Sequence, residues 1–148
     1  MPPTLRDFKH VSDLLRYEVD PQFCREGGKI NNAGTDTLVL PAATHPVRNG
    51  VAAGTYEVCL AGEEAQAIGF VLLTRPETIN AGTSSQRKYP VLVRGPAVLT
   101  QAGFVENDPE DNPYDAAALK TAAEAIPSVI VRDELGTLIE PLNPQGAV

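Results

Sequence analysis

The chain has 148 residues, of which 43% are hydrophobic, and a formal net charge of -7. This length suits a single domain that buries one hydrophobic core. The acidic balance argues against direct binding of nucleic acid, which depends on clustered Lys and Arg. No run of about 18 apolar residues is present, and the N-terminus lacks an apolar signal segment, so we expect a cytoplasmic origin and no membrane partner. Cys24 and Cys59 are too few for a disulfide scaffold and are expected to be free thiols.

Residues 1–26 are predicted to form an N-terminal arm that mixes large apolar and charged side chains. A segment of this kind either folds back onto its own domain or gains its burial from a partner. Tyr and Arg are also enriched at binding hot spots. Two interpretations stay open, an extended binding arm and a short helix that ends at Leu14 and Leu15 and packs on the body. The candidate binding residues are Leu14, Leu15, Arg16, Tyr17, Glu18, Phe23, Arg25 and Glu26.

Residues 27–148 are predicted to form one small β-rich domain, a sheet or a β-barrel, because 13 prolines and 12 glycines exclude long helices nearly everywhere. Alternation of Tyr56 and Val58 with Glu57 and Cys59 predicts a strand with one buried face. The uninterrupted apolar run at 68–73 predicts a central strand covered on both faces. The predicted strands are 37–40, 56–60, 67–73, 90–94, 97–99, 128–131 and 137–139, with loops at 27–36, 41–54, 77–88 and 103–112. The first 13 or so residues and the tail at 141–148 are expected to lack regular structure.

One helix is predicted to start at Asn112-Pro113-Tyr114-Asp115 and to end before Pro127. Asn and Asp accept hydrogen bonds from the first amides of a helix, and Pro is well tolerated in its first turn. The predicted mainly β fold is therefore of the α+β type, with this single short helix in the second half of the chain. Its apolar face is made by residues spaced three and four apart, Leu119, Ala122, Ala123 and Ile126.

The residue types that carry catalysis are sparse, and no catalytic residue, metal site or cofactor is predicted. His10, Ser12 and Asp13 are the types of a hydrolase triad, but they adjoin one another on the arm, whereas a triad converges from separate parts of a fold. His45 is expected to be a solvated loop residue. The His and Cys spacings match no structural zinc site. Residues 108–112 begin like a calcium loop, but Pro113 replaces its glycine, so a solvated acidic loop is expected.

The arm motif Tyr17-Glu18 followed by Phe23-Cys24-Arg25-Glu26 resembles the start of the lambda-type head decoration proteins, the capsid cement proteins of tailed bacteriophages. Val-Leu-Val-Arg-Gly-Pro-Ala at 91–97 and the apolar strand at 67–73 are similar to segments of that family. So is a short helix that leads into an Ile/Val-rich strand, at 116–131. The chain departs from the family at Cys24, where a serine is common, and at 38–41, which replaces the usual Gly-x-Val-Leu-Gly.

The resemblance implies a non-enzymatic virion protein that binds the outer surface of the expanded phage head and stabilises the shell after DNA packaging. Trimers at local three-fold positions are implied. The implied partners are the phage major capsid protein and further copies of this chain, with assembly in the host cytoplasm and final localisation on the outside of the head. The candidate binding residues of the arm would then contact the capsid, with Tyr17 and Phe23 as apolar anchors. The alternative is a small β-rich oligomeric interaction module unrelated to capsids, whose loop at 41–54 binds a small ligand.

Overall fold

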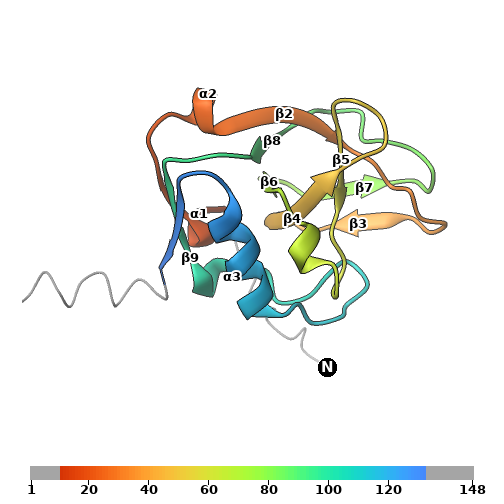
Figure 1. Ribbon diagram of the computed structural model, residues 1–148. Coiled ribbons are helices and arrows are strands. Elements are labelled where there is room, and N and C mark those ends of the chain that lie inside the picture. The colour runs from red at the N-terminus through yellow and green to blue at the C-terminus, as the bar shows by residue number, and fades with distance from the viewer. Residues whose placement is uncertain (1–10, 133–148) are drawn as a thin grey trace, which may run out of the picture.

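A closed β-barrel forms the centre of the molecule (Figure 1). The computed structural model describes residues 11–132, except for the side chains of Ser12, Asp13 and Arg16. Neighbouring barrel strands are antiparallel, apart from β2 and β5, which are parallel. In their order around the barrel the strands are β2 (Arg25–Ile30), β5 (Thr55–Val58), β4 (Thr44–Asn49), β6 (Gly69–Leu72) and β8 (Tyr89–Leu92). With 38% strand and 18% helix, the structure confirms the predicted mainly β domain.

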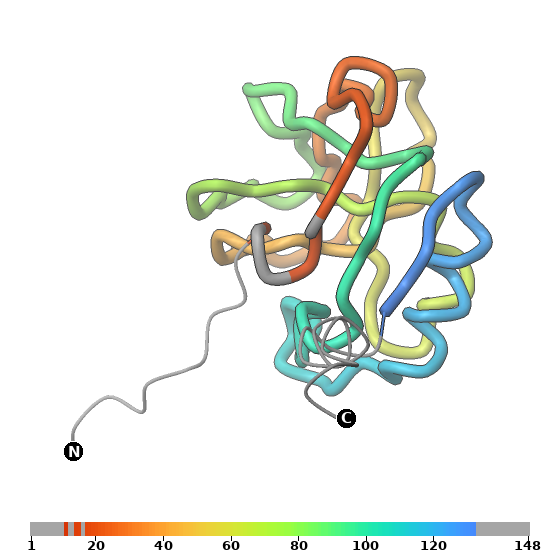
Figure 2. Tube along the Cα trace, turned by 90° about the vertical axis from the view of Figure 1, so that its left-hand side faces the viewer, coloured from red at the N-terminus to blue at the C-terminus, as the bar shows by residue number. Residues whose placement is uncertain are grey.

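A three-stranded sheet lies beside the barrel and contains the first and the last strand of the described chain (Figure 2). Its central strand β9 (Ala97–Thr100) pairs antiparallel with β1 (Leu15–Glu18) and parallel with β10 (Val129–Arg132). A separate two-stranded sheet joins β3 (Leu38–Leu40) to β7 (Glu77–Ile79). The helical elements are α1 (Val11–Leu14), α2 (Pro21–Cys24), η1 (Glu64–Gln66), η2 (Gln101–Gly103) and α3 (Ala116–Ala125).

Two large hydrophobic clusters make the core. One fills the barrel and includes Val47, Tyr56 and Val71. The other lies between the barrel, the three-stranded sheet and α3, where the rings of Phe70 and Phe104 are 5.6 Å apart at their centroids. Since β6 contributes Val71 to one cluster and Phe70 to the other, alternate side chains of one strand bind the two halves of the core together.

The predicted helix is confirmed as α3, although it begins only at Ala116, so Pro113 precedes the helix; it ends at Ala125, one residue before the C-cap Ile126. The carboxylate of Asp115 accepts hydrogen bonds from the amides of Ala117 and Ala118, as the capping pattern predicts. The apolar face is also confirmed, because all four of its residues are buried, Leu119, Ala122, Ala123 and Ile126. The small alanines let α3 approach β10 and η1 closely.

Most predicted strands are confirmed with ends shifted by one or two residues, as β3, β5, β6, β8, β9 and β10. Strand β6 is buried along its whole length and lies between β4 and β8, as the uninterrupted apolar run predicts. The strand predicted at 137–139 falls outside the described residues, as does the tail.

Three of the predicted loops were wrong, because they contain the strands β2, β4 and β7. In β2, Gly28 admits a neighbour instead of making a turn, because a Cβ added there would lie 2.3 Å from the Tyr56 ring. In β4, Pro46 has no amide to donate, but its carbonyl accepts a hydrogen bond from Cys59 N at 2.9 Å. Gly and Pro thus serve strand packing here rather than turns.

The predicted one-sided burial of the strand at Tyr56 was also wrong. Tyr56 and Val58 face the barrel core as expected, but Glu57 is buried beside the Arg48 guanidinium, 3.1 Å away. Cys59 is buried beneath α3. A polar residue in an alternating pattern does not identify a solvated face when an ion pair or a helix covers it.

The predicted arm is part of the body from α1 onward. Residues 15–18 form an edge strand of the three-stranded sheet, and the expected boundary at residue 26 falls inside barrel strand β2. Leu14 ends α1 and is fully buried in the second core cluster, which Leu15 also contacts. Of the two interpretations left open, the structure shows the short helix packed on the body, while residues 1–10 lie outside the described part.

Candidate interaction surface

The structure divides the predicted arm residues into buried supports and exposed groups. Leu14 has no exposed surface, which corrects its assignment as a binding residue, and Leu15 is half-buried against the same core. Tyr17 is 59% exposed and Phe23 is 57% exposed. Both project from short elements whose backbones are fixed, because β1 is paired with β9 and α2 is capped by the side chain of Asp20. The two aromatic rings are therefore presented to solvent on an ordered framework.

The charged residues of the predicted arm hold this framework together. The guanidinium of Arg25 donates two hydrogen bonds to the carboxylate of Glu18, one of them from Nε to Oε2 at 3.1 Å. The Glu18 side chain is only 8% exposed, so this two-pronged ion pair joins β1 to β2 with little competition from water. Glu26 pairs with Arg94, whose Nη2 lies 2.5 Å from Oε1. The side chain of Arg16 is outside the description.

Two apolar residues that the sequence did not single out extend the surface. Val98 of β9 is in register with Tyr17 on one side and with Ile130 of β10 on the other. Ile130 is 51% exposed and alternates with the buried Val129 and Val131. We call Tyr17, Val98 and Ile130 the sheet row. The alternation of β10 could have indicated an exposed Ile130, but its neighbours follow only from strand register.

Arg94 was also missed as a surface residue, although it belongs to the Val-Leu-Val-Arg-Gly-Pro-Ala segment. Its guanidinium lies over the Phe23 ring, with Cζ 5.3 Å from the ring centroid. Its Nη1 donates a hydrogen bond to the carbonyl of Phe23 at 2.5 Å. A stacked guanidinium and an exposed aromatic ring form the kind of pair found at binding hot spots.

His45 is a buried residue of β4 and not the solvated loop residue that the sequence predicted. Its Nε2 lies 2.9 Å from the carbonyl of Pro41, which identifies Nε2–H as the donor, while Nδ1 has no hydrogen-bond partner. Burial, which outweighs that hydrogen bond, lowers the pKa of His45. Because 44–49 is a barrel strand, the ligand-binding loop considered at 41–54 is also wrong over those residues.

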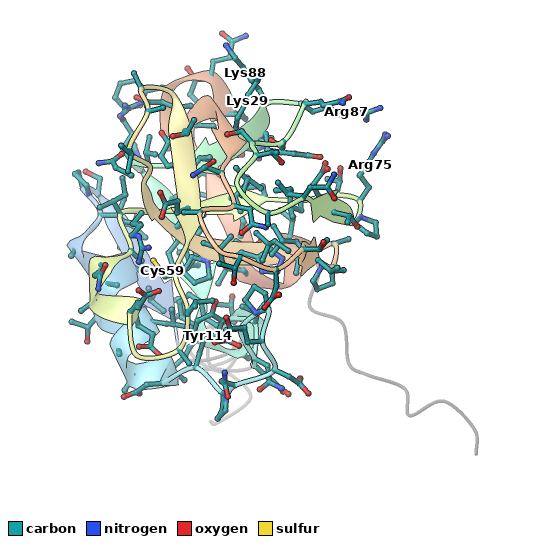
Figure 3. The ribbon with its side chains drawn as sticks, turned by 90° about the vertical axis from the view of Figure 1, so that its right-hand side faces the viewer. Lys29, Cys59, Arg75, Arg87, Lys88 and Tyr114 are labelled. Carbon is teal, nitrogen blue, oxygen red and sulfur yellow. The ribbon has the colours of Figure 1, made fainter. Side chains whose placement is uncertain are left out.

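The acidic loop before α3 is more ordered than a solvated loop. Asp108 is buried, and its carboxylate accepts hydrogen bonds from the amides of Ala61, Glu110 and Asn112. Tyr114 donates its hydroxyl to the carbonyl of Cys59 at 2.5 Å, so this loop is tied to the end of β5 (Figure 3). Burial, together with the charge of Asp108, raises the pKa of Tyr114. The acidic side chains therefore fix the approach to α3.

Both cysteines are free thiols and both are buried. Burial raises the pKa of Cys59 to about 12, so its thiolate is rare at neutral pH. Among residues 11–132, no group of three or more His, Cys, Asp or Glu side chains is placed to hold a metal ion. His10 lies outside that range. None of the described helices is long and apolar enough to cross a membrane.

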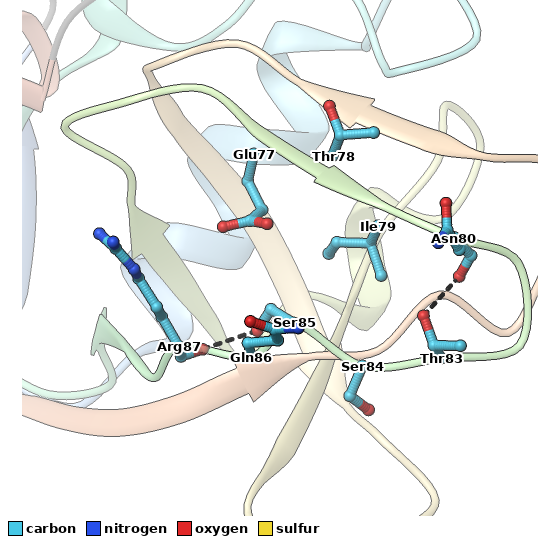
Figure 4. Close-up of a pocket in the computed structure, with 9 residues that line it drawn as sticks. All are labelled: Glu77, Thr78, Ile79, Asn80, Thr83, Ser84, Ser85, Gln86 and Arg87. Carbon is cyan, nitrogen blue, oxygen red and sulfur yellow. Dashed lines mark hydrogen bonds between the residues drawn. The ribbon is translucent and has the colours of Figure 1, made fainter.

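A polar pocket of about 330 Å³ opens between β7 and the loop that follows it (Figure 4). Two of its hydroxyl groups are engaged within the loop: Thr83 donates to the carbonyl of Asn80 and Ser85 donates to that of Arg87. These bonds shape the loop. Figure 3 shows four basic residues at the end of the molecule opposite Tyr114, namely Lys29, Arg75, Arg87 and Lys88. None of the four makes an ion pair within the described part of the chain.

Tyr17 on β1 and Phe23 on α2 make the candidate site, because both are large apolar side chains exposed on ordered backbone. Comparison of the chain with protein-family models, with curated proteins and with solved structures found no match.

Proposed function

We propose that this protein is a capsid decoration protein of the lambda type, which binds the outer surface of the expanded phage head without catalysing a reaction. The observation that carries the proposal is the exposure of Tyr17 and Phe23 on ordered backbone, within the motif that resembles the family. Burial of such rings against a partner is a main source of binding energy at hot spots. The sheet row adds Val98 and Ile130 to the same proposed surface.

The partners in this proposal are the phage major capsid protein and two further copies of the chain at each local three-fold position. The protein would be made in the host cytoplasm and would end on the outside of the virion. Its effect on the shell is mass action: a ligand that binds only the expanded lattice stabilises that lattice by RT ln(1 + [L]/Kd). Repetition over many sites multiplies this stabilisation against the pressure of packaged DNA.

Co-sedimentation with expanded, undecorated heads of the phage that carries this chain tests the proposal. We expect saturable binding that reaches about one copy of this protein per capsid subunit, since each three-fold site joins three subunits and takes three copies. Tyr17→Ala combined with Phe23→Ala should weaken binding by roughly 100-fold or more, because hot-spot truncations typically cost about 2 kcal/mol each. The thermal unfolding midpoint of this variant should change little, since both rings are mainly exposed.

Val51→Ala is the matched control, because Val51 is 98% exposed and lies in the β4–β5 turn, outside the proposed surface. Its binding should equal that of the unchanged chain. Deletion of residues 1–26 is a poor test, since it removes β1 and the start of β2. Heads shown to be expanded and free of competitor that fail to bind the unchanged chain would overturn the proposed function.

A further inference from the structure

Phe23 is held in place by a residue from a distant part of the sequence. Arg94 lies between β8 and β9 and makes three contacts around α2. Its guanidinium stacks on the Phe23 ring at 5.3 Å, Nη1 donates to the carbonyl of Phe23 and Nη2 donates to the carboxylate of Glu26. One planar group therefore fixes the ring, the backbone and a neighbouring carboxylate at once, which a lysine ammonium could not do.

The contacts around Arg94 continue into the barrel. Glu26 also accepts a hydrogen bond from the hydroxyl of Tyr56 at 3.4 Å, and Tyr56 belongs to β5. The amide of Val93 donates to the carbonyl of Cys24 at 3.0 Å, which ties the end of β8 to the end of α2. Phe23 is thus attached through Arg94 and Glu26 to the barrel.

Arg94 keeps binding capacity on its outer side. The guanidinium has five N–H donors, of which the described contacts use two, and the side chain is 33% exposed. Free donors of Arg therefore lie beside an aromatic ring that is 57% exposed. A partner that receives this pair needs apolar groups for the ring and oxygen acceptors at the edge for the remaining N–H donors, since Glu26 already pairs with the charge of Arg94.

We propose that Phe23 and Arg94 form one preassembled binding element, in which Arg94 positions the ring and the pair enters an apolar pocket edged by oxygen acceptors on the partner. This inference rests on the proposed function only for the identity of the partner, the phage capsid. Holding the ring before association removes an ordering cost that a mobile side chain would otherwise incur on binding. Arg94 is therefore a determinant of affinity that acts partly through Phe23.

The positioning claim can be tested in the free protein. The chain contains no tryptophan, so Phe23→Trp introduces a single fluorescent reporter at this site. With Arg94 present, the steady-state anisotropy of the indole should be close to that set by tumbling of the whole domain. Adding Arg94→Met should lower the anisotropy and raise quenching by acrylamide, and Arg94→Lys should give intermediate values. Far-UV circular dichroism verifies the fold, and Arg94→Lys decides the question if Arg94→Met fails to fold.

The partner's chemistry is tested by titrating expanded heads at several salt concentrations. Arg94→Met should weaken binding about tenfold or more, because the partner must then immobilise the Phe23 ring and the charged contact of Arg94 is lost. Loss of that contact should also reduce the salt dependence of binding. Unchanged indole anisotropy together with unchanged affinity would overturn the inference, even if the unfolding midpoint falls. If Arg94→Met lowers the anisotropy in the free protein but the unchanged chain does not bind heads, the proposed function would be overturned and the positioning role would stand.

Discussion

Tyr17 of β1 and Ile130 of β10 lie in one row across the three-stranded sheet, because each is paired in register with Val98 of β9. One comes from the first and the other from the last strand of the described chain, and each is more than half exposed. An apolar row on the outer face of a sheet contributes nothing to the core beneath it. Such a row contributes to the free energy of association when a partner covers it.

Ile130→Asp should therefore impair binding to expanded heads at least tenfold while leaving the fold intact. The new carboxylate would lie in the middle of a surface from which binding excludes water, and burying an unpaired charge is unfavourable. Val39→Asp is the matched control, since Val39 is 58% exposed and also lies in a strand, β3, outside the sheet row. Co-sedimentation gives the affinities and thermal denaturation gives the stabilities. Equal binding by the two variants would exclude Ile130 from the interface.

Gly95→Ala should destabilise the protein by roughly 3 kcal/mol, as expected for an atom forced into filled space. A Cβ at position 95 would lie 1.9 Å from the carbonyl oxygen of Ser128, and backbone cannot yield as a flexible side chain can. Gly27→Ala is the control, because a Cβ there meets nothing within 4 Å. Urea unfolding of both variants measures the difference. A loss at Gly95 no larger than that at Gly27 would contradict the close approach of the Ser128 carbonyl to position 95.

Tyr114→Phe should cost about 1–3 kcal/mol of unfolding free energy, since it leaves the buried carbonyl of Cys59 without its donor. The same change at the exposed Tyr17 should alter stability by less than about 0.5 kcal/mol. Chemical denaturation monitored by circular dichroism compares the pair. The prediction fails if the two substitutions have equal effects.

Stability should fall as the pH drops below about 6.5, before most carboxylates titrate. Burial lowers the pKa of His45 in the folded protein, so the unfolded chain takes up this proton at a higher pH than the folded one. The stabilisation is thus complete above the unfolded pKa of 6.5 and is lost progressively below it. Unfolding measured between pH 5 and 7.5 in a His10→Gln background should show this slope. Adding His45→Gln should remove it, and persistence of the slope would assign it to other groups.

The sequence predicted the elements whose signals are local. The Asp115 cap with the spacing of Leu119 and Ala123 determines α3, and the apolar run through Phe70 and Val71 determines β6. Strands β2 and β4 were missed because Gly and Pro are the residue types of turns. In the structure, Gly28 makes room for the Tyr56 ring, and the carbonyl of Pro46 accepts a hydrogen bond from the Cys59 amide. His45 was misjudged with them, since its burial follows from the strand that contains it.

For the candidate site, residue type sufficed to select Tyr17 and Phe23, the two aromatic residues of the motif, and the structure finds both exposed. Residue type could not distinguish Leu14, which is buried in the core, from residues that face solvent. The alternation of β10 indicates that Ile130 is exposed, but its place beside Tyr17 depends on strand register, and the role of Arg94 depends on a contact between distant segments. That these surfaces bind a capsid stays a prediction.

The pairing of β1 and β10 with the same central strand has a mechanical consequence. Leu15 and Val131 both pair with Leu99, and Arg132 pairs with Thr100, so the chain enters the sheet at residue 15 and leaves it at residue 132 at the same end of β9. The first and the last strand of the described chain can therefore be tethered from one side of the sheet. Tension that pulls residues 15 and 132 apart would act across the hydrogen bonds that join β1, β9 and β10, and these bonds would open one after another from that end.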